Sequence, residues 1–332
     1  MHMKEVNEFR KDYLLNEWTT VVSKRAKRPS DIKKASDKKV KRKGVDKSCP
    51  FCPGNEFMTP PESHRIERKG KWSMRVVGNK YSALGMEKKF FSERKGIYWR
   101  KGAHGIHEVV IETPSHSKDL ADLSEKEISE LFRVFKERTR ELMKKKDIKY
   151  VFCFKNHGRE CGTSLEHSHS QIIGFPFIPE RIEMEINESR KYFRRERKCI
   201  FCEVVKKEGK SNRKIRENES FIAIAPFASK WPYEYWVLSK KHKSSLSEMS
   251  EKELIDLGKI MKYLLKKMKS ILHNPAYNFV LHCSMKGNAC YHFHIEVYPN
   301  IDKKWGGIEK GTGVILNEAP PEMAAMYLGE RT

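Results

Sequence analysis

Apolar residues alternate with polar or β-branched residues in several short segments of the chain. Residues 17–23 and 107–114 show this period of two, which is typical of β-strands. Residues 124–146 and 250–269 instead carry apolar side chains at helical spacing, and each begins with Ser-Glu-Lys-Glu, the sequence of a capping box. The pattern therefore predicts two long amphipathic helices, one in each half of the chain.

Two strands are predicted after each helix. The first ones cover 150–155 and 277–282, and the second ones, at 168–177 and 291–299, alternate strictly. The second strands carry the His-x-His elements, which are His167 to His169 at the start of the first and His292 to His294 within the second. Because successive side chains on a strand point to opposite faces, both histidines of a pair share one face of the sheet. We expect an α+β fold in which each half is an antiparallel sheet with one long helix packed across it.

Cysteine and histidine residues recur in the same order in the two halves. The first copy has Cys49, Cys52, His116 and the pair His167 and His169, and the second has Cys199, Cys202, His242 and the pair His292 and His294. We interpret this repeat as an internal duplication. It divides the chain into an N-terminal half, 1–187, and a C-terminal half, 188–332, with the boundary in the charged stretch 185–198.

The formal charge of +23 is compatible with a nucleic-acid-binding protein. Lys and Arg are interspersed with Glu on the predicted helices, however, as expected of solvated amphipathic faces. Only residues 24–47 form a concentrated basic run, so a non-enzymatic, zinc-dependent nucleic-acid-binding protein is the alternative from another functional class. The sequence shows no signal-peptide pattern and no 18-residue apolar run, and we expect a cytoplasmic protein without a membrane segment.

The cysteines favour metal binding over disulfide bonds. Four of the eight form Cys-x-x-Cys pairs, the usual spacing of a zinc site. In each half, this pair, the single histidine and one histidine of the His-x-His pair supply four ligands for a tetrahedral ion. We expect two zinc ions per chain, each fully coordinated by protein and therefore structural rather than catalytic.

One histidine of each pair remains once the zinc ligands are chosen. In the N-terminal half it is accompanied by residues suited to phosphate chemistry, namely Asn156, Gly158, Gly162, Thr163, Ser164 and Gln171. Such loops present N–H groups and hydroxyls to phosphate oxygens, and a neutral imidazole can attack phosphorus and carry a nucleotidyl group. The C-terminal half has Phe293 and Glu296 in place of Ser168 and Gln171. We interpret it as a degenerate copy that keeps its metal but not the chemistry.

Segments along nearly the whole chain resemble the galactose-1-phosphate uridylyltransferase family of the histidine-triad superfamily. They are RAKRP (25–29), CPFCPGNE (49–56), VVGNKYSAL (76–84), SHSKDL (115–120), NHGRECGTSLEHSHSQ (156–171) and GTGVILNEAPPEMAA (311–325). The resemblance implies two tandem histidine-triad-like halves and a UDP-glucose–hexose-1-phosphate uridylyltransferase that acts on a nucleotide sugar and a sugar 1-phosphate.

The resemblance also implies roles for single residues. His169 matches the histidine that becomes nucleotidylated, Gln171 the amide that holds the α-phosphate, and Ser164 a residue that stabilises charge on the phosphoryl oxygens. The residues that match substrate contacts are Arg25, Arg28, Asn79, Asn156, Gly162, Thr163, Ser164, Gln171, Lys304 and Gly307. The loop with Lys304 and Gly307 comes in part from the neighbouring subunit in this family, which implies a homodimer. The residues that match or mirror the zinc ligands are Cys49, Cys52, His116, His167, Cys199, Cys202, His242 and His292.

The implied reaction moves a uridylyl group from UDP-glucose to galactose 1-phosphate through uridylyl-His169, with ping-pong kinetics. A glutamine at position 171 cannot act as a general acid, which favours transfer over hydrolysis. Two features resemble the ADP-glucose phosphorylase branch and archaeal-type members: HSHSQ (167–171), where many uridylyltransferases have HPHGQ, and the second Cys-x-x-Cys pair. The alternative is therefore an ADP-glucose phosphorylase in which inorganic phosphate takes an adenylyl group from His169.

Overall fold

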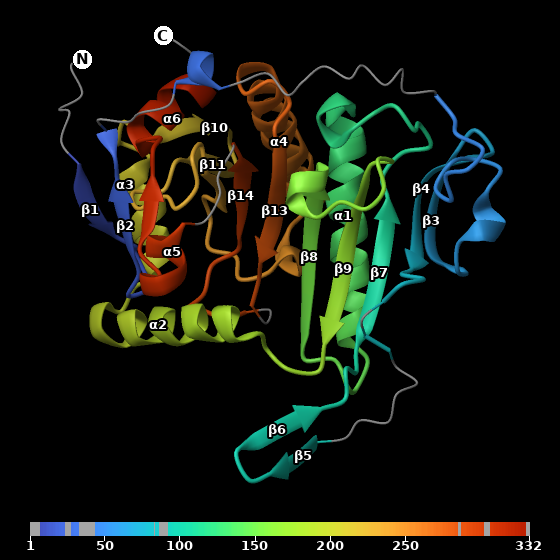
Figure 1. Ribbon diagram of the computed structural model, residues 1–332, viewed down its shortest axis with the longest axis horizontal. Helices are drawn as coiled ribbons and strands as arrows, with labels where there is room; N and C mark the ends of the chain where they lie inside the picture. The colour runs from blue at the N-terminus through green and yellow to red at the C-terminus, as the bar shows by residue number, and fades with distance from the viewer. Residues whose placement is uncertain are drawn as a thin grey trace.

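One ten-stranded antiparallel sheet runs through both halves of the chain (Figure 1). The computed structural model describes residues 7–23, 28–32, 44–82, 84–85, 92–284, 287–301 and 306–329. The strand order is β3-β4-β7-β9-β8 in the N-terminal half, followed by β13-β14-β12-β11-β10 in the C-terminal half. From its outer edge to the junction, each half therefore has equivalent strands in the same order, in agreement with an internal duplication.

The strands of the first half are β3 (Glu62–Arg68), β4 (Lys71–Gly78), β7 (Ile106–Ile111), β8 (Tyr150–His157) and β9 (His169–Phe175). Those of the second half are β10 (Lys214–Glu217), β11 (Phe221–Ile224), β12 (Tyr235–Ser239), β13 (Ala276–His282) and β14 (His294–Asn300). The two halves join where β8 pairs with β13, with Asn156 opposite Asn278. The predicted pair of sheets is therefore one continuous sheet, because its inner edge strands bond to each other.

The two predicted long helices lie side by side on one face of this sheet (Figure 1). They are α1 (Glu125–Met143) and α4 (Glu251–Ile271), and both begin with the predicted capping box, at Ser124 and Ser250. The helices approach closely at Gly258, where a Cβ atom would lie 2.0 Å from the Ser129 side-chain oxygen. A larger residue at position 258 would force the helices apart.

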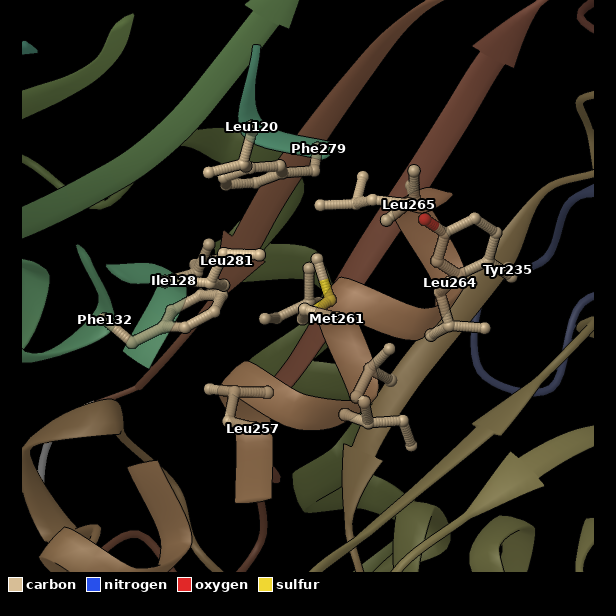
Figure 2. Close-up of a cluster of buried hydrophobic side chains, with 14 of the residues drawn as sticks. Leu120, Ile128, Phe132, Tyr235, Leu257, Met261, Leu264, Leu265, Phe279 and Leu281 are labelled. Carbon is tan, nitrogen blue, oxygen red and sulfur yellow. The ribbon is translucent and has the colours of Figure 1, made fainter. Parts of the chain in front are cut away.

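The main hydrophobic core lies between these helices and the sheet and is shared by both halves (Figure 2). Ile128 and Phe132 of α1 pack there with Leu257 and Met261 of α4, and all four side chains are almost fully buried. Phe279 of β13 lies in the same cluster. Because apolar surface from both halves is removed from water in one cluster, the halves stabilise each other.

The remaining elements flank the large sheet. They are β1 (Glu8–Lys11), β2 (Trp18–Val21) and β15 (Ile315–Asn317) in a small sheet, the hairpin β5 (Ser92–Lys95) and β6 (Tyr98–Lys101), and the helices α2 (Glu180–Glu196), α3 (Ile200–Glu208), α5 (Gly307–Thr312) and α6 (Pro321–Leu328). Strand β2, predicted within 17–23, pairs with β15 and so packs with the C-terminal half. The stretch 185–198, predicted only as a charged boundary, is mostly helix α2, because Ile182 and Ile186 give it a buried face.

Candidate active site and metal centres

Two groups of two cysteines and two histidines are assembled as the sequence predicts. They are Cys49, Cys52, His116 and His167 in the first half, and Cys199, Cys202, His242 and His292 in the second. In the first group the sulfur of Cys52 lies 3.4 Å from Nδ1 of His116 and 3.6 Å from Nδ1 of His167. Zinc bonds of 2.0 to 2.3 Å in a tetrahedron place sulfur and nitrogen about 3.6 Å apart. The donor types and spacings therefore fit a tetrahedral zinc ion.

The second group has the same dimensions. The sulfur of Cys202 lies 3.4 Å from Nδ1 of His242 and 3.5 Å from Nδ1 of His292. The other ring nitrogen, Nε2, donates to a backbone carbonyl in His292 (Ser239, 2.8 Å), as it does in His167 (Thr113, 2.7 Å). Hydrogen bonds of this kind fix the tautomer and leave Nδ1 free to bind a metal.

A third group that could hold a metal lies in the second half and was not predicted. Its members, Glu185, His282 and His294, are all buried, and their ligand atoms lie within 4.8 Å of one another. Sequence analysis singled out neither Glu185 nor His282, because neither stands in the repeated Cys and His pattern. Only the fold brings helix α2 against strands β13 and β14.

His169 is the first residue of β9 and is 7% exposed. Its Nδ1 donates to the carbonyl oxygen of His167 over 2.8 Å, so Nε2 carries the free lone pair. Burial lowers the pKa of the ring, which keeps the imidazole neutral near pH 7. The ring of Phe51, from the Cys49–Cys52 segment, packs edge-on against it at 5.4 Å. The arrangement presents a neutral nucleophile in a fixed orientation.

His169 lines a cavity of about 770 Å³ together with some of the residues predicted to bind phosphate. Asn156, Thr163 and Ser164 line the same cavity, which extends to the turn 272–276 between α4 and β13. The loop that carries Thr163 and Ser164 begins at Gly158 and includes Gly162, and both glycines have positive φ, 83° and 88°. At Gly158 a side chain would also collide with Ala276, so the tight path of this loop requires glycine.

Residues of the C-terminal half hold the loop that begins at Gly158 in place. Asn278 of β13 donates through Nδ2 to Oδ1 of Asn156 over 2.7 Å and to the carbonyl oxygen of Cys161 over 3.0 Å. Asn300 of β14 donates to the carbonyl oxygen of Glu160 over 3.3 Å. The C-terminal half therefore supports the site from outside the N-terminal half, a role that sequence analysis did not identify.

Gln171 follows His169 by two residues on β9, so both side chains lie on the same face of the sheet. Gln171 is held by His107, a residue that sequence analysis missed. Nε2 of His107 donates to Oε1 of Gln171 over 2.8 Å, while Nδ1 of His107 accepts from Nδ2 of Asn79 over 3.3 Å. Burial lowers the pKa of His107, so the ring is neutral and able to play both roles. With Oε1 occupied, the amide N–H₂ of Gln171 remains as the group that can donate to a phosphate oxygen.

His294 occupies the position of His169 in the second half, but its surroundings differ. Its Nδ1 donates to the carbonyl oxygen of His292 over 2.9 Å, as in the first half. Its Nε2 lies 3.3 Å from a carboxylate oxygen of Glu296, and the ring is 1% exposed beneath Phe201 and Trp236. The free nitrogen of the first half is thus occupied here, which fits the interpretation of a degenerate copy.

The remaining predicted substrate residues in the described part of the chain do not line the cavity, and they include Asn79, Gly162 and Gln171. Arg28 is exposed at the start of a 3-10 turn, although Ile32, four residues on, lines the cavity. Gly307 is exposed at the start of α5, which packs against β15. Arg25 and Lys304 lie outside the described residues.

Further observations concern the general class of the protein. In the described part of the chain, no helix is long and apolar enough to cross a membrane. The eight cysteines are all free thiols. Most of the basic run 24–47, on which the nucleic-acid alternative depends, lies outside the described residues.

Comparison with known proteins gives one family for the whole chain. The model of the N-terminal domain of galactose-1-phosphate uridyl transferase matches residues 1–179, and that of the C-terminal domain matches 185–305. The chain is 33% identical to an ADP-glucose phosphorylase of Arabidopsis thaliana, over 97% of this chain and 92% of the relative. It is 32% identical to a galactose-1-phosphate uridylyltransferase of Thermotoga maritima, over 97% and 98%.

Solved structures agree with this assignment. A crystal structure of an ADP-glucose phosphorylase from Arabidopsis thaliana with bound ADP-glucose superposes with a TM-score of 0.82 at 29% identity, covering 98% of this chain and all of the other. A structure of a uridylyltransferase superposes with a TM-score of 0.75 at 27% identity, covering 97% of each chain. The expected family and α+β fold are confirmed, and the chain belongs to the galactose-1-phosphate uridyl transferase family.

Proposed function

We propose that this protein is a nucleotidylyltransferase that moves a uridylyl group from UDP-glucose to galactose 1-phosphate through a covalent adduct on His169. The observation that carries the proposal is the free Nε2 of His169 at the cavity, fixed by the hydrogen bond from Nδ1 to His167. Membership of the family, with relatives named galactose-1-phosphate uridylyltransferase, supports this choice of substrates.

In the first step, Nε2 of His169 attacks the α-phosphorus of the nucleotide sugar. The bond from phosphorus to the bridging oxygen breaks, and glucose 1-phosphate leaves with the electron pair, so no general acid is needed. The proton on Nδ1 stays in place, and the carbonyl of His167 stabilises the positive charge that the ring acquires. The amide of Gln171 and the hydroxyl of Ser164 donate to the phosphoryl oxygens, where negative charge develops.

In the second step, a phosphate oxygen of galactose 1-phosphate attacks the same phosphorus. The P–N bond breaks, its electrons return to Nε2, and UDP-galactose leaves. Asn156, near the end of β8, and Gly162 and Thr163, in the loop that follows, position the phosphates during both steps. Asn79 acts through His107 on Gln171.

A second candidate is an ADP-glucose phosphorylase, in which the adduct is adenylyl-His169 and inorganic phosphate is the acceptor. The serines of HSHSQ, the complete second Cys-x-x-Cys group and the similarity to the Arabidopsis phosphorylase favour it. The first step is the same, so the candidates differ in base and acceptor.

Each of the two groups of cysteine and histidine ligands holds one zinc ion in this proposal. Four protein ligands complete each tetrahedron, so the ions stabilise the fold and supply no position for substrate. The Sγ to Nδ1 spacings of 3.4 to 3.6 Å support this assignment. Cysteines that form no disulfide bond persist in a reducing compartment, and we place the protein in the cytoplasm for that reason.

The protein is proposed to act as a homodimer. Figure 1 shows the hairpin β5–β6 standing apart from the large sheet, and its residues Ile97, Tyr98 and Trp99 are 67% to 88% exposed. An isolated hairpin with exposed aromatic residues is marginally stable in water, and a second copy of the chain would bury it. The dimer would also let the partner supply the segment around Arg28, or that around Lys304 and Gly307, to the cavity.

The test is a labelling experiment. The protein is incubated with UDP-glucose or ADP-glucose that carries ³²P at the α-phosphate, and the denatured protein is separated by electrophoresis. The proposal requires label on the wild type and none on the His169→Gly variant. Label that persists on the variant, or no label on the wild type with either nucleotide sugar, would contradict the proposal.

A further inference from the structure

A buried cluster of polar side chains lies directly behind the nucleophile, on the opposite face of β9. Nζ of Lys155 donates to the carbonyl oxygen of His169 over 2.9 Å, to Oε2 of Glu112 over 2.8 Å and to Oγ of Ser168 over 3.1 Å. The side chains of Lys155 and Glu112 are 1% and 0% exposed. An ion pair so deeply buried gives up the hydration of both charges, so its value for stability alone is small.

The same cluster holds the residues on either side of the nucleophile. Ser168 donates to Oε2 of Glu112 over 2.5 Å, and Ser170 donates to Oε1 of the same carboxylate. Three consecutive residues, Ser168, His169 and Ser170, are therefore tied to one ion pair. Side chains alternate along a strand, so the His169 ring lies on one face of the sheet and the side chains of Ser168 and Ser170 lie on the other. Lys155 and Ser168 line the same cavity as His169.

The cluster depends on the two serines that distinguish HSHSQ. A proline at position 168 or a glycine at position 170 would have no hydroxyl to donate to Glu112. The carboxylate of Glu112 would then keep its ion pair with Lys155 but lose its hydrogen bonds to β9.

The second half provides an internal comparison. Phe154 pairs with Gln171 and Val280 pairs with Glu296, so the residues that follow, Lys155 and Leu281, hold equivalent register positions. The residues that flank His294 are Phe293 and Ile295. Leu281, Phe293 and Ile295 are all buried and apolar. The C-terminal half, in which His294 has no free nitrogen, thus has apolar side chains where the N-terminal half has the polar cluster. Its strands form without such a cluster.

We infer that Lys155 and Glu112, through Ser168 and Ser170, are positioning residues for His169. The inference rests on the proposed function of His169 as the nucleophile. The cluster fixes the position and direction of the β9 backbone at His169. It thereby fixes the direction in which Nε2 of His169 points toward the phosphorus atom. Displacing a reacting atom by about 1 Å can lower a rate roughly 100-fold, and this is the effect expected when the cluster is lost.

The test compares two double variants. E112Q/K155M removes both charges of the cluster at nearly constant volume and leaves no unpaired charge behind. R138M/E108Q removes another buried ion pair, between α1 and β7, whose Nε to Oε2 distance is 3.0 Å and which does not contact residues 168–170. Both proteins are checked for folding by circular dichroism and for zinc content. The single-turnover rate of adduct formation is then measured as a function of UDP-glucose and ADP-glucose concentration.

A positioning role requires that E112Q/K155M lowers the maximal rate roughly 100-fold while the apparent Kd stays within about twofold, and that R138M/E108Q keeps the wild-type rate. Equal loss in both double variants, or a wild-type rate in E112Q/K155M, would overturn it. If E112Q/K155M does not fold, Ser168→Ala and Ser170→Ala provide the same comparison, since each removes one hydroxyl and keeps the ion pair. Wild-type rates in both serine variants would equally overturn the inference.

A readout without substrate separates this inference from the proposed function. In ¹⁵N-histidine spectra, assigned by loss of the signal in His169→Gly, the wild-type ring should show the Nδ1–H tautomer. A mixture of tautomers in E112Q/K155M supports positioning even if no adduct forms on the wild type, in which case only the proposed function fails. If E112Q/K155M shows both the wild-type tautomer and the wild-type rate, the positioning inference fails and the proposed function of His169 is unaffected.

Discussion

Nδ1 of His169 donates a 2.8 Å hydrogen bond to the backbone carbonyl of His167, the residue two positions earlier on the same strand. The ring of His167 belongs to the first group of zinc-type ligands. His167, a member of this group, and His169, the proposed nucleophile, are thus two residues apart, and the carbonyl of His167 sets which ring nitrogen of His169 is free. The second half repeats the bond between His294 and His292 but leaves no free nitrogen.

The first prediction concerns this difference between the halves. His169→Gly should abolish the covalent adduct, and His294→Gly should leave it detectable, because Nε2 of His294 faces Glu296 in a closed environment. Both variants are labelled with α-³²P nucleotide sugar, and the modified peptide is identified by mass spectrometry. Label on His294 in the wild type would reverse the assignment of the active and degenerate halves.

The second prediction concerns the metal ions. Elemental analysis should find close to two zinc ions per chain, and Cys49→Ser and Cys199→Ser should each remove one. Loss of a closed site should cost about 3 kcal/mol or more of folding free energy. That corresponds to a fall in Tm of roughly 4 °C or more in calorimetry for a chain of this length.

The two cysteine variants should differ in activity. Cys49→Ser should also slow adduct formation, because Phe51, which lies between Cys49 and Cys52, and His167 of the first group both contact His169. Cys199→Ser should change stability more than rate. A protein without zinc, or a Cys49→Ser variant that is fully stable, would contradict the structural role of the ions.

Much of the fold follows from local patterns. The capping boxes at Ser124 and Ser250 and the strict alternation around the His-x-His pairs are short-range signals, and the structure confirms the helices and strands that they predict. The repeated spacing also predicts both groups of two cysteines and two histidines that the fold assembles and that could hold a metal ion.

The contacts that sequence analysis missed are long-range. Asn278 supports the loop near Asn156 only because β8 and β13 pair, and no pattern in the sequence specifies that pairing. His107 and Gln171 meet across neighbouring strands in the same way. Lys155 and Glu112 look like ordinary surface charges in the sequence, since only the fold brings them together as a buried ion pair.

The third prediction tests the Asn79–His107–Gln171 chain of hydrogen bonds. His107→Phe keeps the ring but removes the donor to Oε1 of Gln171, so the amide can turn its oxygen toward the phosphate. The rate of adduct formation should fall roughly tenfold, the value of one hydrogen bond of about 1.4 kcal/mol. His64→Phe, on the edge strand β3, is the control and should keep the wild-type rate. Equal rates for the two variants would remove His107 from the site.

The fourth prediction concerns the hairpin. The double variant Tyr98→Lys/Trp99→Lys should shift the protein from dimer to monomer in light scattering, because two charges replace the exposed aromatic surface. Ile255→Lys, on the outer face of α4, is the control and should remain dimeric. A wild-type protein that is monomeric at micromolar concentration, or a hairpin variant that stays dimeric, would exclude the proposed interface.

The last prediction concerns the acceptor, where the two candidate functions separate. The covalent enzyme is prepared with each nucleotide sugar, freed of sugar 1-phosphate by gel filtration, and mixed with either galactose 1-phosphate or inorganic phosphate. A uridylyltransferase should discharge uridylyl-His169 rapidly with galactose 1-phosphate and give UDP-galactose. A phosphorylase should discharge adenylyl-His169 with phosphate and give ADP.

Both acceptors attack through a phosphate oxygen, so His169 and its hydrogen bonds cannot discriminate between them. The choice depends on whether the site binds the sugar ring. We expect galactose 1-phosphate to discharge the adduct at least tenfold faster than phosphate, since sugar contacts orient the attacking oxygen. Rapid discharge by phosphate with galactose 1-phosphate inert would reject the uridylyltransferase and favour the phosphorylase. The covalent step on His169 would stand in either case, because both acceptors draw on the same adduct.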